Sequence, residues 1–139
     1  MTPIGLTCIY QETSSHDYVI VIDQPLFSKA RPRLTRSGHA YMPAAYKEAQ
    51  SLMRRKISSQ WFYGPLEGPI SLSIDVYGEG RGDTDNIAGA FMDAAQGILF
   101  TDDRVSVIPS LTINWQKAAR SESLWRIGIS GINEPLILA

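Results

Sequence analysis

The chain has 139 residues, 44% of them hydrophobic, which is the size and composition of one globular domain, and we expect a single domain over residues 1–139. No apolar run approaches the roughly 20 residues that a membrane-spanning helix needs, the first residues lack the pattern of a secretory signal, and the lone Cys8 excludes an internal disulfide. We therefore expect a cytoplasmic protein without a membrane partner. The net charge of −1, taken alone, argues against a nucleic-acid partner.

The first half of the sequence predicts a strand, a basic loop and a helix. Residues 18–22 form an apolar, β-branched run, which predicts a strand that ends near Pro25. Residues 27–43 contain two prolines and Gly38 and are expected to form a loop. Pro43 suits a helix start, and apolar residues recur at helical spacing in residues 44–62, so we expect a helix there.

The second half predicts a strand, a helix and two more strands. Residues 70–77 alternate between apolar and polar, as in a half-buried strand. Residues 87–98 carry a helical apolar stripe, with Asp85 as a candidate N-cap. Two β-rich stretches follow, residues 104–116 and residues 124–131. The order predicts an α+β fold in which a small, mainly antiparallel or mixed sheet packs with two helices.

The basic residues are concentrated in one part of the chain. Between Gln24 and Gln60 there are eight Lys and Arg residues and a single acid, Glu48, so this window has a net charge of +7 while the rest of the chain has −8. Such an asymmetry is typical of a surface that meets a polyanion, although a solvated basic face gives the same pattern about as often. The basic residues of the window are Lys29, Arg31, Arg33, Arg36, Lys47, Arg54, Arg55 and Lys56.

Four aspartates flank the second predicted helix, Asp83 and Asp85 before it and Asp102 and Asp103 after it. A helix of about a dozen residues spans roughly 18 Å, so the helix alone cannot join the two pairs. They would meet if the strand ending at Gly78 paired in antiparallel fashion with a strand beginning near Arg104. The converging carboxylates would then suit Mg²⁺, whose chemistry serves phosphodiester hydrolysis. Ordinary turns and a helix N-cap explain each pair at least as readily.

Other site patterns do not fit. An EF-hand fails because the ligand position after Asp85 is Ile87, and the glycines near residue 80 match no dinucleotide or P-loop motif. His16 and His39 lack metal-ligand spacing and Cys8 has no cysteine partner, which argues against zinc.

Three segments together resemble the RusA family of Holliday junction resolvases. They are KARPR at 29–33, the YMP of residues 41–43 followed by Tyr46, and GDTDNIAGAFMDAAQGILFTDDRV at 82–105. The resemblance runs from about Pro25 to Ile129 and is specific in the order of its segments. It implies a Mg²⁺-dependent endodeoxyribonuclease with Asp83, Asp85 and Asp103 as catalytic and metal-binding residues, and Asp102 as a supporting carboxylate.

The same resemblance implies a homodimer, common in phages and prophages, that binds four-way or branched DNA and makes paired cuts. A two-fold dimer supplies the two active sites that symmetric resolution requires. A related nuclease acting on flaps or forks would keep the same acids. The DNA-binding candidates are the basic residues of the loop and helix, namely Lys29, Arg31, Arg33, Arg36, Arg54, Arg55 and Lys56.

The chain departs from the family pattern at one position. Members usually have a lysine four residues after the second aspartate of the DxD, where its charge can reach the scissile phosphate, and this chain has Gly89 there. Arg81, Arg104 or Lys29 are candidates to supply the missing charge from elsewhere. The alternative is a protein that binds junctions or branched DNA with weak or lost cleavage.

Overall fold

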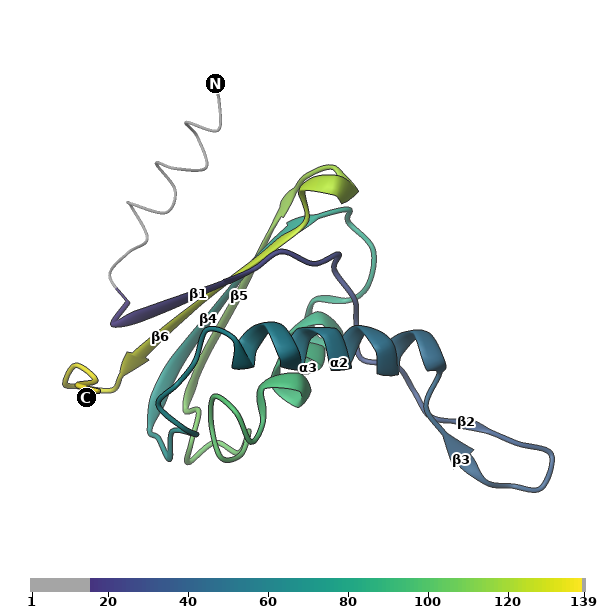
Figure 1. Cartoon of the computed structure of the whole chain (residues 1–139), viewed down its shortest axis with the longest axis horizontal. Coiled ribbons are helices and arrows are strands. Elements are labelled where there is room, and N and C mark those ends of the chain that lie inside the picture. The colour runs from purple at the N-terminus through teal and green to yellow at the C-terminus, as the bar shows by residue number, and fades with distance from the viewer. Residues whose placement is uncertain (1–15, 139) are drawn as a thin grey trace.

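The computed structural model describes residues 16–138 and contains a four-stranded sheet with two helices on one of its sides (Figure 1). The elements are β1 (Tyr18–Ile22), β2 (Arg33–Leu34), β3 (Ala40–Tyr41), α2 (Ala44–Ser58), β4 (Ile70–Gly78), α3 (Thr84–Ala95), β5 (Ser110–Lys117), the 3₁₀ helix η1 (Arg120–Glu122) and β6 (Leu124–Gly131). This confirms the predicted α+β fold with two helices and a mixed sheet. Cys8 and residues 1–15 as a whole, where no secretory signal was expected, lie outside the described residues.

The four strands follow the order β1-β6-β4-β5. Strand β6 is antiparallel to both β1 and β4, whereas β4 and β5 are parallel, with Ser71 beside Ser110 and Gly78 beside Lys117. The antiparallel pairing expected between β4 and the strand after α3 is therefore wrong, as is its expected start near Arg104. Parallel neighbours need a long crossover connection, and α3 with the segment after it returns the chain to the end of the sheet where β4 begins.

The core lies between the sheet and the two helices. In β4 the alternate residues Leu72, Ile74 and Val76 are buried, and the apolar stripe of α3, which includes Phe91, belongs to the same cluster. The Trp125 ring of β6 lies 6.4 Å from the ring of Phe91, and its Nε1 donates to the Gln24 carbonyl at 3.1 Å. Burial of this apolar surface fixes α3 against the sheet and so determines where its two ends lie.

The predicted basic loop contains a small hairpin, which the sequence did not reveal. Strands β2 and β3 pair Arg33 with Tyr41, and the turn is closed by a bond of 2.9 Å from the Thr35 N–H to the His39 carbonyl. All residues from 31 to 41 are exposed. The hairpin projects from the body beyond the start of α2 (Figure 1).

Within residues 16–138, no helix is both long and apolar enough to cross a membrane.

Candidate functional site

Asp83 and Asp85 lie where the chain passes from the end of β4 into α3. Asp83 occupies the N-cap position with an extended backbone, and the helix begins at Thr84, so the prediction of Asp85 as the N-cap was wrong by two residues. The Asp83 side chain makes no capping bond; its Oδ2 lies 3.5 Å from Asn86 Nδ2. Both carboxylates are exposed, and the positive end of the helix dipole stabilises their charge.

Asp102 and Asp103 lie beyond the other end of α3. The Asp103 N–H donates to Asp102 Oδ1 and the Arg104 Nε donates to Asp102 Oδ2, each at 2.7 Å. The bond from the Asp103 N–H, together with the neighbouring Arg104, holds the pKa of Asp102 below its usual value. Asp102 thus has both oxygens engaged by its neighbours, while Asp103 is exposed.

The two pairs of aspartates do not meet within one chain. Asp103 lies near the beginning of β4, since the Thr101 N–H donates to the Leu66 carbonyl at 3.0 Å, whereas Asp83 follows the end of the same strand. The parallel pairing of β4 with β5 is the reason for this separation. Among residues 16–138, no group of three or more His, Cys, Asp or Glu side chains is placed to hold a metal ion.

Lys29 lies along α3 at the position of Gly89. Its backbone N–H donates to the Asn86 carbonyl at 2.7 Å, a Cβ added at Gly89 would lie 3.4 Å from Lys29 Cδ, and Lys29 Nζ pairs with Asp93 Oδ2 at 3.4 Å. The lysine thus covers the glycine but directs its charge one turn further along the helix, away from Asp85.

The other two candidates for the missing charge lie at opposite ends of α3. Arg104 is paired with Asp102. Arg81 stands in the exposed loop two residues before Asp83, which makes it the candidate nearest to Asp83 in the chain.

Asp93 connects the two ends of the segment that carries the hairpin. It pairs with Lys29 before the hairpin, and Tyr46 after it donates its hydroxyl to the same Asp93 oxygen at 3.4 Å. Burial, together with the charge of Asp93 and this hydrogen bond, raises the pKa of Tyr46 to about 12. Asp93 thus acts as a hydrogen-bond acceptor on the face of α3.

The predicted basic residues fall into two groups with different surroundings. Arg31, Arg33 and Arg36 are exposed on the hairpin. On α2, Arg54 Nη1 donates to the carbonyls of Ala94 and Gln96 at 2.9 and 3.0 Å and so caps the end of α3. Lys56 pairs with Asp23 Oδ1 at 3.0 Å.

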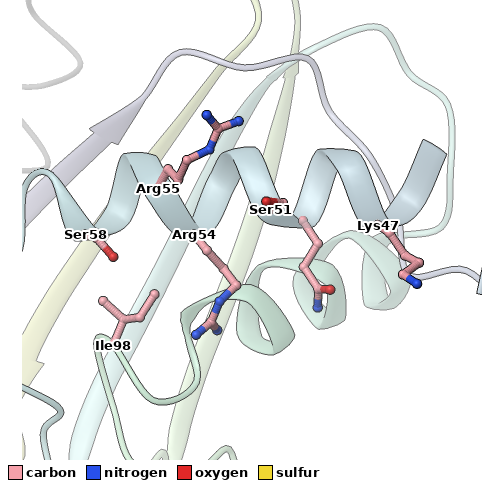
Figure 2. Close-up of a pocket in the computed structure, with 7 residues that line it drawn as sticks. Lys47, Ser51, Arg54, Arg55, Ser58 and Ile98 are labelled. Carbon is pink, nitrogen blue, oxygen red and sulfur yellow. The ribbon is translucent and has the colours of Figure 1, made fainter. Parts of the chain in front are cut away.

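A basic hollow of about 530 Å³ runs along α2. Figure 2 shows Arg54 reaching toward the turn that carries Ile98, while Arg55 leaves the helix on another side. None of the described residues around the hollow is acidic; they are Lys47, Gln50, Ser51, Arg54, Arg55, Ser58 and Ile98. Lys47 lines this surface together with the two arginines. From the sequence it was placed in the basic window but was not named as a DNA-binding candidate.

The protein is therefore an α+β protein with an exposed carboxylate turn at the N-terminus of α3. Its basic surfaces lie apart from that turn, on the projecting hairpin and on α2. Residues 23–122 match the family model described as Endodeoxyribonuclease RusA. The match covers the hairpin, both helices, β4 and β5, so the chain belongs to the RusA family of endodeoxyribonucleases. A search of curated proteins gives no match.

Proposed function

We propose that this protein is a Mg²⁺-dependent endonuclease that resolves four-way DNA junctions. Membership of the RusA family over residues 23–122 carries the proposal, and the exposed Asp83 and Asp85 at the start of α3 support it. Their carboxylate oxygens are the hard ligands that Mg²⁺ prefers. A bound Mg²⁺ would supply an activated water and neutralise charge on the phosphate.

The ligand set fits Mg²⁺ in kind but is divided between two ends of the molecule. Asp83 and Asp85 would hold the ion at the start of α3, while Asp103 follows a helix of 12 residues. We propose that Asp103 completes the site of a second copy in a homodimer. A two-fold axis that sets the 101–104 turn of one copy beside the start of α3 in the other creates two such sites. Asp102, held by Arg104, would then orient Asp103.

Mixed dimers test this composite site. Asp83→Asn and Asp103→Asn homodimers should each bind a junction but lose cleavage by at least about 100-fold, the usual scale for removing an essential catalytic group. A mixed dimer of the two variants has one site with both lesions and one intact site, so it should nick a single strand. If each subunit builds its own site, the mixed dimer is inactive. A mixed dimer of wild type with Asp83→Asn, which keeps one intact site in either case, is the matched control.

The basic surfaces would hold the DNA. Arg31, Arg33 and Arg36 on the hairpin are exposed and suited to phosphate contacts, with Lys29 at its base, and Arg54 and Arg55 offer a second surface on α2. Lys56 and Lys29 are weaker candidates because their charges are paired with Asp23 and Asp93. We assign the missing charge near the scissile phosphate to Arg81. On this assignment, Gly89→Lys gives no gain in cleavage and Arg81→Ala loses it.

A second function is favoured by the surroundings of Gly89. The lysine that covers this glycine is paired with Asp93, so no lysine charge is directed from α3 toward Asp85 in the described chain. A protein that binds junctions or branched DNA and cleaves them slowly or not at all fits that observation. Tight junction binding without cuts in Mg²⁺ or in Mn²⁺ would select this function over the nuclease.

A further inference from the structure

A small hollow lies directly beside the acidic turn and has a different character from the basic hollow on α2. It measures about 160 Å³ and is bounded by the end of β4, the loop before Asp83, the first turn of α3 and the edge strand β5. Its walls include Val76, Ile87, Ile113 and Trp115, and its polar side chains are Arg81 and Thr84.

The ring of Trp115 is held in a fixed place at this hollow. Its Nε1 donates to the Gly78 carbonyl at 3.2 Å, which bends the indole over the end of β4. A Cβ added at Gly80 would lie 3.0 Å from Trp115 Cζ2, so the loop passes close to the ring only because residue 80 is a glycine. Trp115 is nevertheless 47% exposed. The ring is therefore held in place while about half of its surface stays open to a ligand.

The chemistry of the hollow identifies the kind of ligand that it would take. A volume of 160 Å³ is well below the roughly 300–1,000 Å³ of pockets for drug-sized molecules, so it suits a single flat ring system rather than a whole nucleotide. Apolar walls do not suit a phosphate. An indole face offers stacking to any base, while a hydroxyl can bond to a base edge.

We propose that this hollow binds one unpaired nucleobase of the DNA strand that is cut. Thr84 lines it and stands between Asp83 and Asp85, so a base held there belongs to a nucleotide adjacent to the phosphate at the two carboxylates. Trp115 would stack on the base and Thr84 would bond to its edge, while Arg81, at the border of the hollow, would face the adjacent phosphate. The site would thus read the strand next to the cut. This inference rests on the proposed nuclease function and adds a recognition site to it.

A second copy of the chain is the competing occupant. Leu111 and Trp115 are both exposed on β5, which lies at the edge of the sheet. We favour the base because the hollow adjoins the acidic turn and has Arg81 and Thr84 at its border, whereas Leu111 lies outside it. The two occupants make different predictions for the oligomeric state.

Photo-cross-linking tests the proposal. Four-way junctions carrying 5-iodouracil at single positions around the crossover are bound without divalent metal, irradiated, and the cross-linked peptide is identified by mass spectrometry. The wild type should cross-link through Trp115 at one position beside the cut phosphate. Trp115→Ala should lose that cross-link and weaken junction binding by about 5- to 150-fold, the range for one stacked base. Trp115→Phe should retain most of the binding, and Leu111→Ala, outside the hollow, should behave as wild type.

Filling the hollow while keeping the indole gives a second test that does not depend on how Trp115→Ala folds. Ile113→Trp should abolish the cross-link with Trp115 still present. The proposal is overturned if the cross-link forms elsewhere in the wild type, or if Trp115→Ala turns a dimer into a monomer by light scattering and loses affinity only for that reason. Cleavage by wild type without a Trp115 cross-link would reject this inference alone. A Trp115 cross-link without any cleavage would reject the nuclease function instead.

Discussion

Asp93 is one residue of α3 that contacts the hairpin segment on both of its sides. It accepts from the Tyr46 hydroxyl and pairs with Lys29, so a change at this one carboxylate acts on both sides of the hairpin. Neither partner could be assigned from the sequence, because Lys29 and Tyr46 are far from residue 93 in the chain. Only the packing of α2 against α3 brings these groups together.

The raised pKa of Tyr46 gives this contact a measurable signature. Because the pKa in the folded protein is about 12 and the ordinary value is about 10, the folded state favours the neutral phenol. The resulting stability is fully present below pH ~10 and is lost as pH rises from ~10 to 12. Asp93→Asn should lower this pKa and reduce the loss. Tyrosine absorbance titration, with Tyr46→Phe to assign the group, checks the shift; an unchanged Tyr46 titration in Asp93→Asn would contradict it.

The exposed aspartates could be predicted as candidates because their residue type and spacing are visible in the sequence. Trp115 could not, since alternation in β5 shows only that it belongs to a strand. Its role depends on the loop at Gly80 and on the first turn of α3, which adjoin β5 only in the folded chain. Sequence reasoning therefore predicted the acids as site residues, which stays a prediction, but did not single out the aromatic residue that lies beside Asp83 and Asp85 in the fold.

Helix α2 carries two neighbouring arginines with different surroundings. Arg54 donates to the carbonyls at the end of α3, whereas its exposed neighbour Arg55 lines the basic hollow. Arg54→Ala should lower the free energy of unfolding by about 1–2 kcal/mol, because two carbonyls lose a charged donor. Arg55→Ala should change it by less than about 0.5 kcal/mol while still weakening DNA binding. Urea denaturation compares the two; equal stabilities would show that Arg54 does not cap α3.

The β2–β3 hairpin should act on DNA through charge. Arg31→Ala with Arg33→Ala should weaken junction binding and reduce the slope of log K against log salt by about 2, near 0.9 for each lost phosphate contact. Lys56→Ala, which removes a lysine already paired with Asp23, is the control and should have a smaller effect. Fluorescence anisotropy at several salt concentrations measures both. A double variant with the wild-type slope would remove these arginines from the DNA interface.

The predicted antiparallel pairing of β4 with the strand after α3 was wrong, since β4 and β5 are parallel. Thirty-one residues separate Gly78 from Ser110, and they contain a helix that packs back along the sheet, a spacing typical of parallel neighbours. The prediction instead took the β-rich residues from Arg104 as the strand, although Pro109 stands before its actual start. The hairpin was missed because strands of two residues are too short to show alternation.

At the scale of the whole molecule, the acidic and basic features lie on one framework, and the four aspartates stand in two separate places in the chain. The hairpin is tied to α3 through Asp93, so bound DNA would be oriented relative to Asp83 and Asp85. The separation of Asp103 from these two residues is the strongest reason to expect a dimer. Family membership follows from the match over residues 23–122.

Cleavage of a labelled four-way junction in about 10 mM Mg²⁺ tests the central claim most directly, with Asp83→Asn and a linear duplex of the same sequence as controls. We predict paired nicks near the crossover by the wild type, none by Asp83→Asn although it still binds, and no cutting of the linear duplex. Equal treatment of junction and duplex, or nicking that survives Asp83→Asn, would contradict the account.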